Sequence, residues 1–126
     1  MRLLLIVEDD HETRSTMTLL LSEAGYSVCD AADGSRALEK LRSLRPDLVL
    51  LDYGLPAPQG GEEFLRRKAA DPEIAATPVV LLSGYNLPTE MDGTVAVIQK
   101  PFEFEALLAV IERFVGPAQN PDTDAA

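Results

Sequence analysis

The most constraining feature of the sequence is a set of five short runs rich in Val, Ile and Leu, separated by segments with helical periodicity. Four runs are continuously apolar, which is typical of central parallel strands covered on both faces. The run at residues 26–30 alternates apolar and polar side chains and therefore predicts an edge strand. The five predicted strands are residues 3–7, 26–30, 48–51, 79–82 and 95–98.

The segments between the runs carry apolar residues at the three- and four-residue spacing of amphipathic helices. Three helices are predicted over about residues 11–24, 34–44 and 60–70. The last helix begins just after Pro101, and its apolar stripe consists of Phe104, Leu107, Leu108, Ile111 and Val115. Because strand and helix alternate, the sequence predicts an α/β fold, a doubly wound sandwich with right-handed crossovers.

Length and charge limit what the chain can be. Its 126 residues contain 11 Lys and Arg against 21 Asp and Glu, a formal net charge of −10. This length fits one domain, which we place at residues 1–116, whereas residues 117–126 are predicted to be a disordered tail or linker remnant. Such an acidic chain is not expected to bind nucleic acid or an anionic membrane through a basic face.

Cysteine content and the amino terminus indicate a cytoplasmic protein. Cys29 is the only cysteine, so it cannot form an internal disulfide and fits a reducing compartment. Met1 and Arg2 lead directly into the first predicted strand without a signal-peptide cleavage site. No apolar run approaches the roughly 18 residues of a membrane span.

Polar side chains follow the apolar runs where the predicted strands end. They are Glu8, Asp9 and Asp10 after the first strand, Asp52 after the third, Ser83 after the fourth and Lys100 after the fifth. Since ligands bind at the carboxyl ends of strands in open α/β sheets, we expect these residues to gather at one mouth. Oxygen ligands of this kind favour Mg²⁺, which binds through one or two carboxylates and a substrate phosphate.

Each of these residues has both a chemical and a structural interpretation. Clustered carboxylates resist ionising together unless a cation neutralises them, which makes Glu8 and Asp9 candidate metal ligands. Asp52 is a candidate nucleophile toward a phosphoryl group. Lys100 is a candidate to offset the negative charge of a phosphoryl group on the protein. Ser83 is a candidate to donate a hydrogen bond to a phosphoryl oxygen. Taken singly, each could equally be a turn or cap residue, as Asp10 is expected to be for the first helix.

Four motifs occur together in an informative order and spacing. They are IVEDD at residues 6–10, PDLVLLD at 46–52 followed by Leu55, Pro56 and Gly60, PVVLLSG at 78–84, and KPF at 100–102. In this order they resemble bacterial two-component response-regulator receiver domains. The resemblance implies a flavodoxin-like fold with a five-stranded parallel sheet of order 2-1-3-4-5.

The resemblance also implies roles for individual residues. Asp52 takes the phosphoacceptor position, Glu8, Asp9, Asp52 and the backbone carbonyl of Gly54 bind Mg²⁺, and Ser83 and Lys100 respond to the phosphoryl group. Members of this family accept phosphate from a sensor histidine kinase or a histidine phosphotransfer protein. They commonly assist their own dephosphorylation.

The chain departs from the family pattern in two places. Val97 stands where the family usually has an aromatic switch residue, three positions before Lys100. Ser83 and Lys100 are 17 positions apart, which is short for the family by about a helical turn. We therefore predict that the fourth helix of the family is short or absent, and we hypothesise that Tyr85 replaces the missing aromatic as the reporter of phosphorylation.

A short fourth helix would uncover one flank of the last helix. Val110 and Phe114 widen the apolar stripe of that helix, so they either form a partner or homodimer surface or lie in a broad buried face. The sequence leaves both interpretations open.

The predicted function is phosphorelay signalling through Asp52, with output through an unknown partner protein. The chain would be a regulator whose only chemistry is self-phosphorylation from small donors and self-dephosphorylation. It could act alone or as part of a larger regulator or hybrid kinase. Two alternatives stay open: a phosphorylation-independent binding module and a small Mg²⁺-dependent phosphatase.

Overall fold

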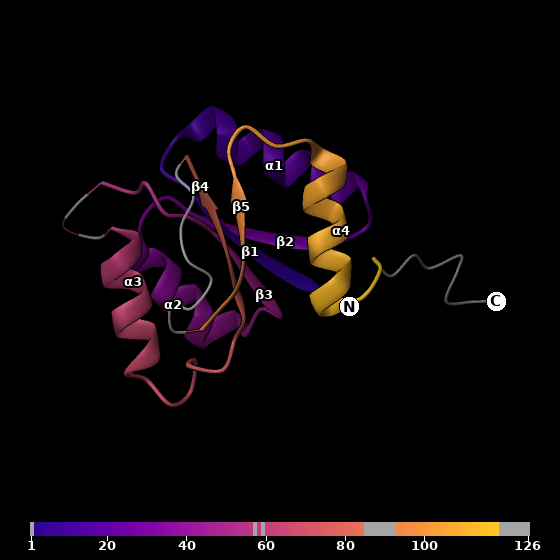
Figure 1. The fold of residues 1–126 in the computed structure, drawn as a ribbon. Coiled ribbons are helices and arrows are strands. Elements are labelled where there is room, and N and C mark those ends of the chain that lie inside the picture. Colours follow the sequence, from indigo (N-terminus) through magenta and orange to yellow (C-terminus); the bar gives the residue numbers. More distant parts are fainter. Residues whose placement is uncertain (1, 57, 59, 85–92, 119–126) are drawn as a thin grey trace.

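The computed structural model describes residues 2–56, 58, 60–84 and 93–118. This part of the chain contains five strands and four helices, which alternate except that β5 follows β4 directly among the described elements (Figure 1). The strands are β1 (Leu3–Val7), β2 (Ser27–Ala31), β3 (Leu48–Asp52), β4 (Val79–Ser83) and β5 (Thr94–Gln99). The helices are α1 (His11–Glu23), α2 (Gly34–Leu44), α3 (Gly61–Ala69) and α4 (Phe104–Val115).

The strands form one parallel sheet in the order β2-β1-β3-β4-β5, which confirms the predicted topology. In the register of the sheet, Val7 lies beside Leu51, and Asp52 lies beside Leu82. The carboxyl ends of β1, β3 and β4 are therefore neighbours, as the predicted site requires.

Two apolar layers enclose the sheet because successive side chains of a strand point to opposite faces. Leu5 and Val49 belong to the layer that packs against α2 and α3, whereas Leu4 and Leu50 belong to the layer that packs against α1 and α4. Figure 1 shows these helices on the two sides of the sheet. Every residue of β3 and β4 is buried, so the middle of the sheet is held from both faces.

The apolar pattern of residues 95–98 indicated a central strand, and that interpretation is wrong; the order 2-1-3-4-5 implied by the resemblance, which places this strand at the edge, is confirmed. The residues of β5 are half-buried or exposed, and the Val95 side chain is 38% exposed. The strand pairs with β4 alone, and a register shift between Val79 and Val80 leaves Val95 without a place in the pairing. Apolar composition alone did not reveal this position. The prediction of an edge at β2 is confirmed.

The extra apolar residues of α4 support the buried interpretation. Val110 and Phe114 are half-buried and pack against the apolar layer on that side of the sheet. Leu107 and Ile111, in the centre of the predicted stripe, are fully buried. The broad stripe of α4 thus covers the sheet.

The connection from β4 to β5 is short. It comprises residues 84–93, of which 85–92 lie outside the described part of the chain, and so does the hypothesis on Tyr85. Ten residues are near the lower limit for a crossover between parallel strands, which usually takes about a dozen. This length is consistent with the prediction that the helix expected between these two strands is short or absent. That helix is distinct from α4, which follows β5.

Residues 119–126 also lie outside the described part, so the predicted boundary at residue 116 stays a prediction. Among the described helices, none has the length and apolar character needed to cross a bilayer.

Candidate functional site

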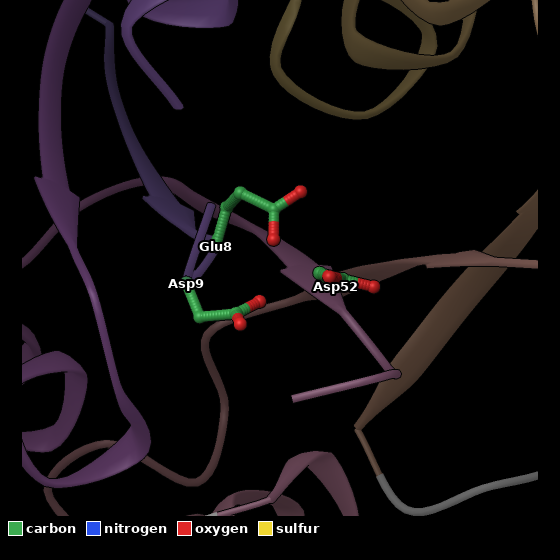
Figure 2. Close-up of side chains that lie close together, drawn as sticks. All are labelled: Glu8, Asp9 and Asp52. Carbon is green, nitrogen blue, oxygen red and sulfur yellow. The ribbon is translucent and has the colours of Figure 1, made fainter. Parts of the chain in front are cut away.

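Three carboxylates from two neighbouring strands meet at the carboxyl edge of the sheet. Glu8 and Asp9 follow β1, and Asp52 ends β3. One oxygen of each carboxylate lies within 4.8 Å of the other two, and Figure 2 shows the three side chains converging. Glu8 and Asp52 are buried, while Asp9 is exposed. The sheet topology brings together the residues that the sequence singled out.

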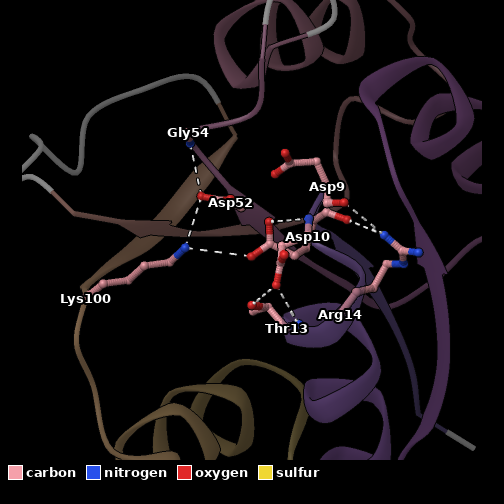
Figure 3. Close-up of polar contacts among 8 residues, drawn as sticks. Asp9, Asp10, Thr13, Arg14, Asp52, Gly54 and Lys100 are labelled. Carbon is pink, nitrogen blue, oxygen red and sulfur yellow. Dashed lines mark hydrogen bonds and ion pairs between the residues drawn. The ribbon is translucent and has the colours of Figure 1, made fainter.

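Lys100 reaches this cluster from the end of β5. Its ammonium nitrogen Nζ lies 3.3 Å from Asp52 Oδ1 and 3.8 Å from Glu8 Oε1 (Figure 3). Its backbone N–H donates to the carbonyl oxygen of Ser83 at 2.7 Å, which ties the end of β5 to the end of β4. The Lys100–Pro101 peptide bond is cis. One cation therefore lies against two of the three clustered carboxylates.

Asp10 lies apart from this cluster in function. Its Oδ2 accepts hydrogen bonds from Thr13 N–H at 2.9 Å and from the Thr13 hydroxyl at 2.6 Å. It is thus the N-cap of α1, as the sequence predicted. The cap fixes the direction in which the chain leaves the site after Asp9.

Two further predicted residues flank Asp52. The N–H of Gly54 donates to Asp52 Oδ1 at 3.0 Å, which orients the carboxylate; the predicted role of the Gly54 carbonyl stays a prediction. Ser83 is the last residue of β4 and is buried, with 3% of its surface exposed. It lies at the neighbouring strand end, where a hydroxyl was predicted.

The pKa values of the two buried carboxyl groups are shifted in opposite directions. The pKa of Glu8 is raised to about 8, first by burial and then by its hydrogen bond to Asp52 and the charge of Asp52. Burial also acts to raise the pKa of Asp52, but hydrogen bonds from Glu8 and Gly54 and the nearby Lys100 ammonium outweigh it, so this pKa is lowered. The environment therefore favours the neutral form at Glu8 and the anionic form at Asp52.

These residues fit a small hard cation. One oxygen of each carboxylate lies within 4.8 Å of the other two, so a single cation placed among them would be in reach of all three. All three donors are oxygen, as Mg²⁺ prefers. Burial and the neighbouring Asp52 carboxylate both disfavour the charged form of Glu8, and a divalent cation bound between the two carboxylates would favour it.

Sequence reasoning missed one residue at the site. Arg14, in the first turns of α1, donates from Nη1 to the carbonyl oxygen of Glu8 at 2.8 Å. Its position on the helix face toward the strand ends was a usable signal, because it lies one turn beyond the Asp10 cap.

Comparison with known proteins decides the family. The model of the response regulator receiver domain family matches residues 4–112. The chain belongs to this family. A receiver domain is a regulator of two-component phosphorelay signalling and not a classical enzyme, which agrees with the predicted class of function.

Individual relatives agree with this assignment. Protein Rrf1 of Nitratidesulfovibrio vulgaris is 31% identical, over 98% of this chain and 93% of its own length. The chemotaxis response regulator CheY4 of Vibrio cholerae is 30% identical with a TM-score of 0.83, over 91% of this receiver domain and 99% of that chain. Several other curated relatives are longer, and the receiver domain spans about half of their length.

One similar structure contains a metal. It is the receiver domain of the sensor histidine kinase PA1611 from Pseudomonas aeruginosa PAO1, with a magnesium ion coordinated in its active-site cleft. It is 26% identical to this receiver domain with a TM-score of 0.81, over 91% of this chain and 98% of that one.

Proposed function

We propose that this receiver domain accepts a phosphoryl group on Asp52 and thereby changes its affinity for an output protein. The observation that carries the proposal is the state of Asp52: a carboxylate with a lowered pKa, at the end of a fully buried strand, beside an acidic cluster and a lysine. An anionic oxygen is the form that attacks phosphorus.

The transfer needs only one bond exchange. An oxygen of Asp52 forms a bond to phosphorus, and the bond from phosphorus to a donor histidine nitrogen or acyl-phosphate oxygen breaks. The donor leaves with the electron pair of the broken bond. Lys100, already 3.3 Å from Asp52, offsets the charge that the phosphoryl group brings.

Glu8, Asp9 and Asp52 would hold Mg²⁺, together with the Gly54 carbonyl that the family resemblance implies. The cation supplies positive charge to the phosphoryl oxygens during transfer. The proposal is supported by the oxygen-only donor set and by the magnesium ion in the related receiver domain.

The added charge is the signal. A phosphoryl group brings about −1.5 to −2 charges at neutral pH, and Ser83 and Lys100 are the proposed groups that move toward it. Val97, at the usual aromatic switch position, is half-buried against the apolar layer that α2 and α3 cover. Output in this receiver domain would therefore depend on groups other than an aromatic at position 97.

The partners follow from this chemistry. The donor would be a sensor histidine kinase or a histidine phosphotransfer protein, and the recipient an output protein. Small acyl phosphates would also serve as donors, and the domain would promote its own dephosphorylation. We place the protein in the cytoplasm, which the free thiol of Cys29 fits.

The test is the intact mass of the protein after incubation with acetyl phosphate, with and without Mg²⁺. We expect one phosphoryl adduct that requires Mg²⁺ in the wild type. The adduct should disappear in Asp52→Asn and persist in the control Asp33→Asn, whose carboxylate caps α2 by accepting from Arg36 N–H. An adduct on folded Asp52→Asn would contradict the assignment, and partner binding unaffected by wild-type phosphorylation would favour the binding-module alternative.

A further inference from the structure

Arg14 occupies an unusual position behind the acidic cluster. From α1, its Nη1 donates to the carbonyl oxygen of Glu8 at 2.8 Å and of Asp9 at 3.5 Å. Figure 3 shows Arg14 beside Asp9. Its side chain is only 16% exposed. A single guanidinium therefore contacts the backbone of both Glu8, whose carboxylate is buried, and Asp9, whose carboxylate is exposed.

The guanidinium is itself held in place from the next strand. Arg14 Nε lies 3.5 Å from Oδ2 of Asp30, near the end of β2. Lys40 on α2 pairs with the other oxygen of Asp30 at 3.8 Å and donates to the Asp30 carbonyl. The forked guanidinium of Arg14 thus connects the edge strand β2 to the loop after β1. This connection requires a planar group with several donors.

Arg14 and Lys100 apply positive charge to the cluster from different directions. Lys100 contacts carboxylate oxygens of Glu8 and Asp52, the atoms that a cation would need. Arg14 contacts carbonyl oxygens in the backbone and leaves the carboxylates free for a metal. It therefore offsets the repulsion among three consecutive acidic residues without competing for their ligand atoms.

We infer that Arg14 is a positioning residue that sets the Mg²⁺ affinity of the receiver domain by fixing the loop that carries Glu8 and Asp9. This inference rests on the proposed function, since it concerns the same metal site. Hydrogen-bond partners behind metal ligands typically change metal affinity about 10- to 100-fold when they are removed.

The test is an NMR titration of the ¹⁵N-labelled protein with Mg²⁺ alone, which gives the Kd without any phosphoryl transfer. We expect the Kd to rise about ten-fold in Arg14→Gln. It should stay at least about three-fold raised in Arg14→Lys, which keeps the charge but loses the fork. Arg36→Gln is the matched control, because Arg36 pairs with Asp33 at 3.8 Å and is 72% exposed.

Two further variants separate the alternatives. Lys100→Gln should bind Mg²⁺ more tightly than the wild type, since it removes a cation that lies 3.3 Å from Asp52 Oδ1 and 3.8 Å from Glu8 Oε1. If Arg14→Gln does not fold, Asp30→Asn tests the same fork from its anchor and should weaken Mg²⁺ binding in the same direction.

The outcomes distinguish the inference from the proposed function. A Kd within two-fold of the wild type in folded Arg14→Gln, or full recovery in Arg14→Lys, would overturn the positioning role alone. A wild type whose amide signals do not respond to Mg²⁺ would overturn the metal site of the proposed function and the inference with it.

Discussion

The centre and the edge of the sheet are built from similar residues but held very differently. Every residue of β3 and β4 is buried, whereas β5, which contains Val95, Val97 and Ile98, is half-buried or exposed. The centre carries Asp52 and Ser83, while the edge leads into Lys100. The proposed phosphoacceptor is thus fixed by packing on both faces, and the proposed sensing lysine follows an edge strand that is less buried.

The largest effect is expected when two side chains of the same size, one in the centre of the sheet and one at its edge, are each replaced by alanine. Leu82 in β4 and Ile98 in β5 lie beside each other in the register, with Leu82 2% exposed and Ile98 half-buried. We expect Leu82→Ala to lower the free energy of unfolding by about 4 kcal/mol and Ile98→Ala by about 2 kcal/mol, because the cost follows burial and cavity size. Urea unfolding measures both. Equal losses in the free energy of unfolding would show that the edge strand is held as firmly as the centre of the sheet.

The next test concerns the shared proton at the centre. Because the folded-state pKa of Glu8 is raised to about 8, the folded protein binds more protons than the unfolded chain between pH 4.5 and 8. The stability that this proton contributes is present below pH 4.5 and lost as the pH rises toward 8. We therefore expect wild-type stability to fall by about 3 kcal/mol from pH 5 to 8, relative to Glu8→Gln.

The measurement is urea unfolding at several pH values in the absence of divalent cations. Glu8→Gln is the matched control because its amide has the shape of the protonated acid and does not titrate. Parallel pH profiles for the two proteins would show that Glu8 does not hold the proton.

A smaller effect on stability is expected for Asp10, the cap of α1, whose role can be distinguished from that of Asp9, the predicted Mg²⁺ ligand. Asp10→Ala removes both hydrogen bonds to Thr13 and should lower the free energy of unfolding by about 1 kcal/mol, with Mg²⁺ affinity unchanged. Asp9→Ala should abolish Mg²⁺ binding with little loss of stability, since Asp9 is exposed. Thermal unfolding and Mg²⁺ titration together check both, and loss of Mg²⁺ binding in Asp10→Ala would move Asp10 into the ligand set.

The smallest effect is expected at the edge itself. Val95 is 38% exposed, so Val95→Thr should change the free energy of unfolding by less than about 0.5 kcal/mol. A loss comparable to that of a core residue would mean that Val95 is covered in solution.

Much of this architecture could be predicted because local rules decide it. The α2 helix begins and ends at the predicted residues, since Asp33 caps its start and Arg45 adopts a left-handed conformation after its end. The gathering of Glu8, Asp9 and Asp52 followed from strand order alone, because parallel strands bring their carboxyl ends to one edge.

Features that depend on distant surroundings could not be predicted in the same way. The apolar sequence of β5 indicated a central strand, but its burial depends on what covers it. The role of Arg14 depends on how close its guanidinium comes to two backbone carbonyls, and residue type does not encode that approach. The opposed pKa shifts of Glu8 and Asp52 likewise depend on burial, on the hydrogen bond between them and on the nearby Lys100 ammonium.

The short β4–β5 crossover also bears on how the chain folds. Closing the ten residues 84–93 costs about 0.8 kcal/mol less chain entropy than closing residues 53–78 between β3 and β4. The β4–β5 pair therefore needs the smaller loop closure of these two adjacent pairs. The short connection lowers the chain entropy lost in adding an edge strand that packing covers less than the centre.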